Sequence, residues 1–377
     1  MGDVFKEYSE KNHTELSALT IIQGGGTVKR EDSDRNLMYD TSNLSNYKMV
    51  RKDDFIVHLR SFEGGLEKSS LDGIISPAYH TFHSDMADSR FYYPYFRSYE
   101  FIKHKLVSHV YGIRDGRSID IDGMKTIEIP YTSIEEQRKI GDYLDCLDHL
   151  ITLHQRKCEQ TKKLKKYMLQ KMFPQNGAKV PEIRFDGFTY DWEQRKLIDY
   201  LEVSSEKNRD NRFTKEDVLS VSGEYGIVNQ IEFQGRSFAG ASVSNYGVVE
   251  NGDVVYTKSP LKSNPYGIIK TNKGIPGIVS TLYAVYKPKE ITDSKFVQIY
   301  FELDSRMNSY MHPLVNKGAK NDMKVSAENA LKGMVSFPKK DEQEMISLYF
   351  STIDHLITLH QRQTDFYKKP NFYFISS

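Results

Sequence analysis

The chain has 377 residues, of which 38% are hydrophobic and 27% charged, and its formal net charge is +1. This length suffices for two domains that each bury a core, and the composition is that of a soluble globular protein. No apolar run approaches the roughly 20 residues of a membrane-spanning helix, and the first residues do not resemble a secretory signal. The near-neutral charge argues against a uniformly basic nucleic-acid-binding protein, but it does not exclude local basic surfaces.

Residues 1–133 form the first predicted domain. Its short apolar runs, rich in Val, Ile, Tyr and Phe, are bounded by Gly, Asn, Asp or Ser. This pattern is typical of strands with a few helices, so we expect a β-rich domain.

Residues 134–173 are predicted to form one long helix, with no proline and a single glycine, Gly141. Its apolar positions step by 4, 3, 4, 3 and 4 residues, which is typical of a coiled-coil seam. The seam positions are Ile140, Leu144, Leu147, Ile151, His154 and Cys158. The end of the helix is rich in lysine, which fits either a solvated face or a stripe facing phosphates. The only cysteines, Cys146 and Cys158, form no disulfide framework, so we expect a reducing, cytoplasmic location.

Residues 174–180 are a predicted linker, and residues 181–340 are a second β-rich domain that repeats the first. Residues 9–12 (Ser-Glu-Lys-Asn) recur as residues 205–208, and residues 73–79 match residues 277–283. The offset between matching segments drifts along the chain, as expected when loops vary and the framework does not.

Residues 341–369 form the second predicted long helix, followed by an atypical tail at 370–377. Residues 148–156 recur without change as residues 354–362, an offset of 206. The second seam has the same spacing and comprises Ile346, Phe350, Ile353, Ile357 and His360. Additional leucines widen each stripe, so each helix is expected to touch a domain or another protein as well. We therefore expect an α+β fold with two pseudo-symmetric β-rich domains separated by a pair of long antiparallel coiled-coil helices.

The predicted helices have a length suited to duplex DNA. About 35 helical residues, rising roughly 1.5 Å each, span on the order of 50 Å. One turn of B-DNA is about 34–36 Å. Two similar domains at opposite ends of such a helix pair could address one face of a duplex, with the helices as a spacer.

Motifs at the junctions between domains and helices resemble those of a known family. Residues 127–130 (Ile-Glu-Ile-Pro) lead through Glu-Glu-Gln to the first helix, and residues 335–338 (Val-Ser-Phe-Pro) lead through Asp-Glu-Gln to the second. Residues 181–188 (Pro-Glu-Ile-Arg-Phe-Asp-Gly-Phe) and 192–197 (Trp-Glu-Gln-Arg-Lys-Leu) add an entry motif for the second domain. Over nearly the whole chain, this doubled order resembles the specificity subunit of type I restriction–modification systems.

The resemblance implies that residues 1–133 and 181–340 are target-recognition domains, each reading one half of a split sequence in double-stranded DNA. The helices would be the conserved spacer regions. The implied partners are two modification subunits, which bind S-adenosylmethionine and methylate adenine, and restriction subunits with ATP- and Mg-dependent translocase and nuclease activity. The chain itself would carry no catalytic centre, no metal and no cofactor.

Both ends depart from the family pattern. Residues 181–196 have no counterpart before Met1, so the first recognition domain is expected to be N-terminally shortened. Pro370 stands where the first copy has Leu164, and a proline inside a helix costs about 3 kcal/mol. We expect the second helix to be shortened and the first domain to be less firmly tethered.

DNA contacts are expected in loops that occupy corresponding positions in the two domains. Arginine suits guanine, whereas Asn or Gln suits adenine. The first set is Arg60, Ser61 and Phe62, paired with Lys258, Ser259, Lys262 and Asn264. The second set is Arg114 and Arg117, paired with Lys317 and Lys320. An ordinary solvated loop is the alternative for any single residue among them.

Catalytic and metal-binding motifs are incomplete. Residues 263–266 (Ser-Asn-Pro-Tyr) lack the second proline of an amino-methyltransferase signature, and residues 24–26 (Gly-Gly-Gly) lack the Lys and Ser/Thr of a phosphate-binding loop. The paired histidines of each helix are five residues apart, which is not the i, i+4 spacing of helical metal ligands. Two alternatives remain: a coiled-coil adaptor that binds protein partners, and a merged DNA methyltransferase.

Overall fold

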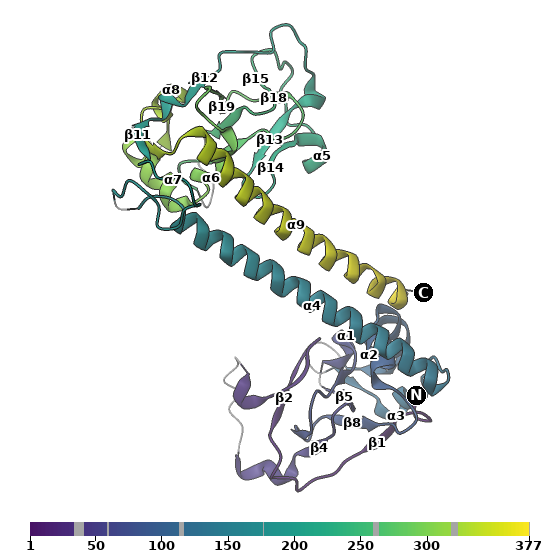
Figure 1. Cartoon of the computed structure of the whole chain (residues 1–377). Helices are drawn as coiled ribbons and strands as arrows, with labels where there is room; N and C mark the ends of the chain where they lie inside the picture. Colours follow the sequence, from purple (N-terminus) through teal and green to yellow (C-terminus); the bar gives the residue numbers. More distant parts are fainter. Residues whose placement is uncertain are drawn as a thin grey trace. The chain divides into compact units, whose positions relative to one another are not determined.

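The computed structural model describes residues 1–33, 41–58, 60–112, 117–175, 177–258, 264–317 and 323–376. The chain divides into two compact units, each described separately below. Unit 1 comprises Met1–Lys157 and His360–Ser377, and unit 2 comprises Cys158–Leu359. Each unit contains a β-rich domain and parts of two long helices, α4 (Ile134–Lys171) and α9 (Lys340–Ser376) (Figure 1).

Unit 1 is built on a four-stranded antiparallel sheet. Its strand order is β1 (Lys6–Tyr8), β8 (His80–His83), β5 (Phe55–Val57) and β6 (Glu67–Lys68). Three antiparallel pairs accompany the sheet: β2 (Leu19–Ile22) with β3 (Gly26–Lys29), β4 (Lys48–Val50) with β7 (Gly73–Ile75), and β9 (Val110–Tyr111) with β10 (Ser118–Ile119).

Unit 2 repeats this arrangement. Its sheet has the order β12 (Leu201–Val203), β19 (Tyr283–Pro288), β16 (Val254–Thr257) and β17 (Ile269–Thr271). The accompanying pairs are β13 (Leu219–Ser222) with β14 (Gly226–Asn229), β15 (Gly247–Val249) with β18 (Gly277–Val279), and β20 (Asn316–Lys317) with β21 (Met323–Lys324). Unit 2 carries one further pair, β11 (Glu193–Lys196) with β22 (Met334–Phe337).

The two domains follow the same chain path, so the duplication seen in the sequence is also a duplication of topology. In the sheets, Phe55 lies opposite Phe82, and Val254 lies opposite Tyr286. An isolated parallel bridge joins Ala18 to Ile74 in unit 1, and its counterpart joins Val218 to Ile278 in unit 2. The predicted α+β fold of two pseudo-symmetric β-rich domains with a pair of long helices is confirmed.

Short helices complete each domain. In unit 1 they are α1 (Ser61–Gly64), α2 (Ser89–Phe96), α3 (Ile121–Lys125), a π-helical turn (Phe101–Lys105) and 3-10 turns at Arg30–Asp32, Thr41–Asn46 and Leu106–His109. In unit 2 they are α5 (Gln230–Gln234), α6 (Ser294–Tyr300), α7 (Asp304–Met311), α8 (Ala327–Ala330) and 3-10 turns at Leu197–Asp199, Lys215–Asp217 and His312–Leu314.

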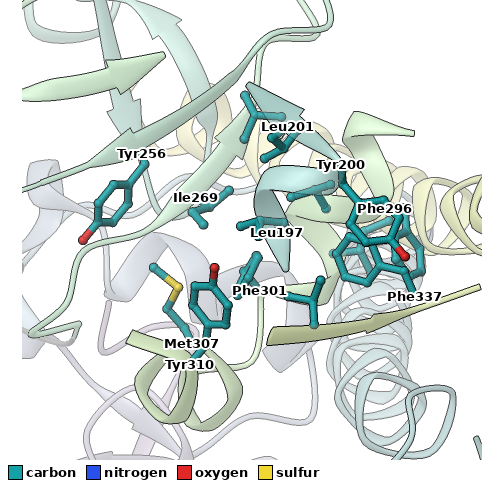
Figure 2. Close-up of a cluster of buried hydrophobic side chains, with 14 of the residues drawn as sticks. Leu197, Tyr200, Leu201, Tyr256, Ile269, Phe296, Phe301, Met307, Tyr310 and Phe337 are labelled. Atoms are coloured by element: carbon teal, nitrogen blue, oxygen red, sulfur yellow. The ribbon is translucent and has the colours of Figure 1, made fainter. Parts of the chain in front are cut away.

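Aromatic side chains dominate both cores. In unit 1, Phe5 packs edge-on against Phe55 and Tyr92, with ring centroids 5.3 and 5.1 Å apart. In unit 2, Phe337 lies 4.6 Å from Tyr200 and 4.9 Å from Phe296, measured between ring centroids (Figure 2). Rings in tilted and edge-on contact add stabilisation to the apolar area that they bury, so each unit has a hydrophobic core of its own.

The long helices pack against each other in antiparallel orientation. In unit 2, Lys165 Nζ lies 2.6 Å from Asp354 Oδ1, and Cys158 Sγ lies 3.9 Å from the Ile357 carbonyl oxygen. As the residue number rises along α4, it therefore falls along α9. The seam positions Leu147, Ile151, Ile346, Phe350 and Ile353 are buried, and Ile140, Leu144, His154, Ile357 and His360 are half-buried.

The ends of the helices differ slightly from expectation. Helix α4 ends at Lys171 and α9 begins at Lys340. Helix α9 also continues through Pro370 to Ser376, whereas the sequence predicted an end at residue 369. A proline lacks one main-chain donor, but the amides after it can still bond to the preceding turn, so the helix need not stop there.

The repeated Glu-Gln motif anchors each long helix to its own domain. Gln137 is fully buried, and its amide accepts a bond from Asp88 N (3.0 Å) and donates one to Thr132 O (2.8 Å). Gln343 is equally buried and makes the same contacts with Asp293 N and Pro338 O, both at 2.9 Å. Asp88 and Asp293 are themselves the N-caps of α2 and α6. The duplicated glutamine therefore ties the start of the long helix to the start of a domain helix in both units.

Candidate nucleic-acid interface

The first predicted loop of unit 1 follows β5 and leads into α1. Arg60 is the N-cap residue of α1 and is exposed. Ser61 is completely buried, and its hydroxyl accepts a hydrogen bond from His58 N at 2.9 Å. Phe62 is half-buried. Arg60 and Phe62 are therefore accessible to a ligand, whereas the Ser61 hydroxyl serves the turn.

The structure brings two predicted groups of unit 1 together. The guanidinium of Arg117 lies 4.9 Å from the centre of the Phe62 ring, and Arg117 is exposed. Stacking on a ring holds an arginine in place, and a guanidinium is a group that binds phosphate or guanine. Beside Arg117 is a cavity of about 40 Å³, which His58 also lines. Burial lowers the pKa of His58, so this ring is neutral near pH 7.

In unit 2, the predicted residue Lys258 stands at the end of β16, which is equivalent to β5. It is half-buried, burial lowers the pKa of its amine, and the charge of Lys207 lowers that pKa further, whereas the charge of Glu328 raises it. Two lysines that repel each other are stabilised by an anion between them.

Lys207 was missed as a contact by the sequence reasoning, although a signal was present. It belongs to the Ser-Glu-Lys-Asn motif that recurs from residues 9–12. Its counterpart Lys11 also acts on a lysine, Lys48. Burial lowers the pKa of Lys48, the charge of Glu7 raises it, and the charge of Lys11 lowers it further. Retention of this lysine in both copies of the motif could have marked it.

The other predicted contacts are only partly visible. Asn264 is half-buried and its carbonyl accepts a hydrogen bond from Gly267 N at 3.0 Å. Lys317 lies in β20, the counterpart of β9, which precedes the Arg117 loop. The four remaining predictions lie outside the described residues: Arg114, Ser259, Lys262 and Lys320.

Different ion pairs connect the domains to their long helices. In unit 1, Arg90 of α2 lies 2.6 Å from Asp142 and 3.2 Å from Asp145 on α4. In unit 2, Lys165 of α4 lies 2.5 Å from Glu302 and 2.6 Å from Asp354. Burial alone would lower the pKa of Lys165, but the two carboxylates outweigh it and raise the pKa, so the amine stays charged.

A second connection in unit 2 uses the entry motif. Arg184 binds both carboxylate oxygens of Glu342, at 2.7 and 2.8 Å, and Trp192 Nε1 donates to Glu342 at 3.3 Å. Glu342 is the glutamate of the second Glu-Gln motif. The entry motif therefore holds the start of α9.

An apolar stripe lies on α9 of unit 2, on a different face from the seam. The exposed fractions are 43% for Met345, 65% for Leu348, 40% for Leu356 and 39% for Leu359. Exposed apolar side chains in a row are suited to contact with another protein. The lysine-rich end of α4 is partly neutralised, since Lys162 and Lys171 pair with Glu159 and Glu182.

Within the described ranges, no three His, Cys, Asp or Glu side chains come together in a way that would hold a metal ion. A search of the same ranges finds no helix with the length and apolar character needed to cross a membrane.

Comparison with known proteins gives a match of fold. No protein-family model matches the chain, and no curated protein sequence matches it. The type I restriction–modification S subunit from M. genitalium matches with a TM-score of 0.50 and 14% identity, over 99% of this chain and 94% of that one. The HsdS subunit from Thermoanaerobacter tengcongensis matches with a TM-score of 0.47 and 18% identity, over 100% and 94%.

A third match comes from a study of complex assembly and conformational transition of the type I R-M system, with a TM-score of 0.45 and 16% identity, over 100% and 95%. At these identities the likeness concerns the fold. The chain has the fold of type I S subunits, with two β-rich domains and two long helices.

Proposed function

We propose that the chain is the DNA sequence-specificity subunit of a type I restriction–modification complex. It binds a bipartite DNA target and positions the modification and restriction subunits. The observation that carries this proposal is the doubled domain, in which the same strand order and the same buried glutamine join each domain to a long helix. A duplicated reader suits a split DNA sequence, because each copy can address its own half.

Each recognition domain reads DNA through the loops described above. In the first domain, residues 1–133, Arg60 and the Phe62-stacked Arg117 supply donors. In the second, residues 181–340, Lys207 and Lys258 supply a phosphate contact. Phosphate contacts set the position on the duplex, and base contacts set the sequence preference.

The helices, residues 134–173 and 341–369, act as the conserved spacer regions and dock two modification subunits. The exposed stripe of Met345, Leu348, Leu356 and Leu359 supports docking on α9. On α4, Tyr143 is 51% exposed and Leu150 and Leu153 are half-buried. The two helices thus offer related, not identical, surfaces to two copies of one partner.

Catalysis in this proposal belongs to the partner subunits. The modification subunits bind S-adenosylmethionine and methylate adenine, and the restriction subunits use ATP and Mg for translocation and cleavage. The present chain supplies the sequence preference, and the complex acts in the cytoplasm, where cellular DNA is accessible.

Co-expression with modification subunits from the same genome, followed by mapping of methylated adenines, tests the proposal. We expect a split, asymmetric target, since the loops of the two domains differ in sequence. Methyl transfer by the isolated chain would instead indicate a merged methyltransferase. Assembly with protein partners without any DNA sequence preference would indicate a coiled-coil adaptor.

A further inference from the structure

Three exposed aromatic side chains belong to the segment that forms the hairpin β13–β14 and α5 of unit 2 and the residues after α5. Figure 1 shows the hairpin and α5. Tyr225 is 62% exposed, Phe233 45% and Phe238 56%. The Tyr225 and Phe233 ring centroids are 5.4 Å apart. Phe238 N donates to Gln230 Oε1 on α5 at 2.7 Å, which holds Phe238 beside the same helix. We call these three side chains the aromatic patch.

The aromatic patch is not needed to build the hairpin. The inward positions Val221 and Ile227 already pack against the cluster of Leu219, Val249, Val255, Val279 and Val285. The equivalent hairpin of unit 1 closes with the same register, Ile22 opposite Gly26, as Ser222 opposite Gly226. Its tip carries Gly24 and Gly25 where unit 2 has Glu224 and Tyr225. The aromatic side chain at the hairpin tip is therefore specific to unit 2.

Charges around the aromatic patch are predominantly acidic. Residues 215–238 contain four acidic residues, Glu216, Asp217, Glu224 and Glu232, and two basic ones, Lys215 and Arg236, so their net charge is −2 (2 − 4). Glu216, Glu224 and Glu232 are exposed, and so are Lys215 and Arg236. The excess of acidic side chains disfavours contact with DNA phosphates.

An aromatic centre with a charged rim is the composition of a protein–protein interface. Tyr, Phe and Arg are enriched in interface centres. The Arg236 guanidinium lies 4.6 Å from the centre of the Phe238 ring, so this side chain is already ordered for contact. Because Arg236 and Phe238 already contact each other, binding would cost little side-chain conformational entropy at these two residues.

We propose that the aromatic patch is a docking surface for a protein partner whose contact face has an apolar centre and a basic rim. The exposed glutamates supply the complementary charge and steer association. This inference rests on the proposed function, because the partner is the modification subunit. It assigns that subunit a contact with the second recognition domain in addition to the helices.

The test uses the full chain co-expressed with modification subunits. Two variants address the aromatic patch: Tyr225→Ser with Phe233→Ser, and the charge reversal Glu224→Lys with Glu232→Lys. The matched control is Ile198→Ser, because Ile198 is an apolar residue that is 42% exposed. It precedes β12, at one edge of the sheet, whereas the hairpin adjoins β17 at the opposite edge. Affinity is measured by biolayer interferometry at several salt concentrations, and target binding by electrophoretic shift.

We expect each patch variant to weaken assembly at least tenfold and the control to leave it unchanged. The charge reversal should also remove much of the salt dependence. Equal assembly of all variants, or loss of DNA binding by the isolated chain without loss of assembly, would overturn the inference while leaving the proposed function intact. Failure of the wild-type chain to assemble would overturn the proposed function, and this inference with it.

Discussion

At the level of single residues, two equivalent charged positions carry opposite signs in the two units. Glu67 in unit 1 and Lys270 in unit 2 hold the same sheet position, opposite Ile56 and Val255. Glu67 is fully buried and pairs with Arg97. Asp88 and Asp293 are equivalent N-cap residues, and Arg97 and Glu302 each lie nine residues after them. Glu302 is therefore the counterpart of Arg97. Burial lowers the pKa of Lys270, and the charge of Glu302 acts against burial by raising it.

This reversal follows from the physics of buried charge. A charge removed from water needs a partner of opposite sign, but either sign can occupy either position. The glycine amides around Glu67 add to its stabilisation, since Gly24 N donates to it at 2.7 Å. The two domains therefore differ in the signs of equivalent buried charges while sharing one sheet architecture.

A second residue-scale difference predicts a pH dependence confined to unit 1. His83 lies 2.5 Å from buried Asp54 and 3.2 Å from Asp85. Burial would lower its pKa, but these carboxylates outweigh burial and raise it above 6.5. Its contribution to stability is consequently present below pH 6.5 and is lost as the pH rises through the raised pKa.

The control for this prediction comes from the chain itself. Lys287 holds the equivalent position in unit 2, following Tyr286 as His83 follows Phe82, and it stays charged. We expect His83→Lys to abolish the fall in hydrogen-exchange protection of β1 between pH 6 and pH 8. An identical pH profile for the variant and the wild type would contradict the assignment.

The lysine pair of unit 2 gives a prediction about DNA affinity. Lys207→Gln and Lys258→Gln should each weaken binding and reduce the slope of log K against log salt concentration by about 0.9, the value for one lost phosphate contact. Sequence preference should change little, because phosphates carry no base identity. Filter binding between about 50 and 200 mM salt measures both the affinity and the slope. Lys179→Gln, in the linker and 76% exposed, is the control and should leave the slope unchanged.

At the level of elements, the sequence predicted the helices well because their spacing is a local signal. The 4-3 pattern located both seams, and the repeated histidines meet in unit 1, where His154 Nδ1 lies 3.1 Å from His360 Nδ1. The roles of Gln137 and Gln343 could not be predicted, because their partners lie in a domain helix about 50 residues away along the chain. The spacing of apolar residues predicts which face of a helix is buried, but it does not predict the hydrogen-bond partners of a buried glutamine amide.

These glutamines predict the largest stability effects. Gln343→Met keeps the volume of the side chain but leaves Asp293 N and the Pro338 carbonyl without their partner. We expect a loss of about 1–3 kcal/mol in the free energy of unfolding of unit 2. Denaturant unfolding, followed by hydrogen exchange in each unit, measures it.

The matched variants locate the effect. Gln137→Met should have the same consequence in unit 1, where the bonds to Asp88 N and Thr132 O are lost. Gln361→Met, at an exposed position of the same helix α9, should change the free energy of unfolding by less than about 0.5 kcal/mol. A loss of similar size for Gln361→Met would show that the amide contacts are not the cause.

At the level of the whole molecule, the sequence predicted the duplication and the fold class, whereas the DNA contacts stay a prediction. Matching segments locate equivalent strands, so Arg60 and Lys258 were placed at the ends of β5 and β16. Burial of Ser61 was not predictable, because its hydroxyl is used by the His58 amide within one turn. The aromatic patch was not predicted from the sequence, because a strand pattern does not reveal which aromatic side chains stay exposed.

The duplication also predicts that the two halves of the target are read independently. Arg117 belongs to unit 1 and Lys258 to unit 2, and each unit has its own core. Changes at such sites usually add within about 0.3–0.5 kcal/mol, because the residues share no partners. The double variant Arg117→Ala with Lys258→Ala should therefore lose the sum of the two single losses in binding free energy.

A base-substitution scan of the target completes this test. Arg117→Ala should relax base preference in one half of the split sequence and leave the other half unchanged. Lys258→Ala should weaken binding to all sequences alike, since a phosphate contact carries no base identity. A coupling free energy above about 1 kcal/mol, well outside the additive range, would mean that the two domains bind DNA as one cooperative surface, because independent readers have no path for such coupling.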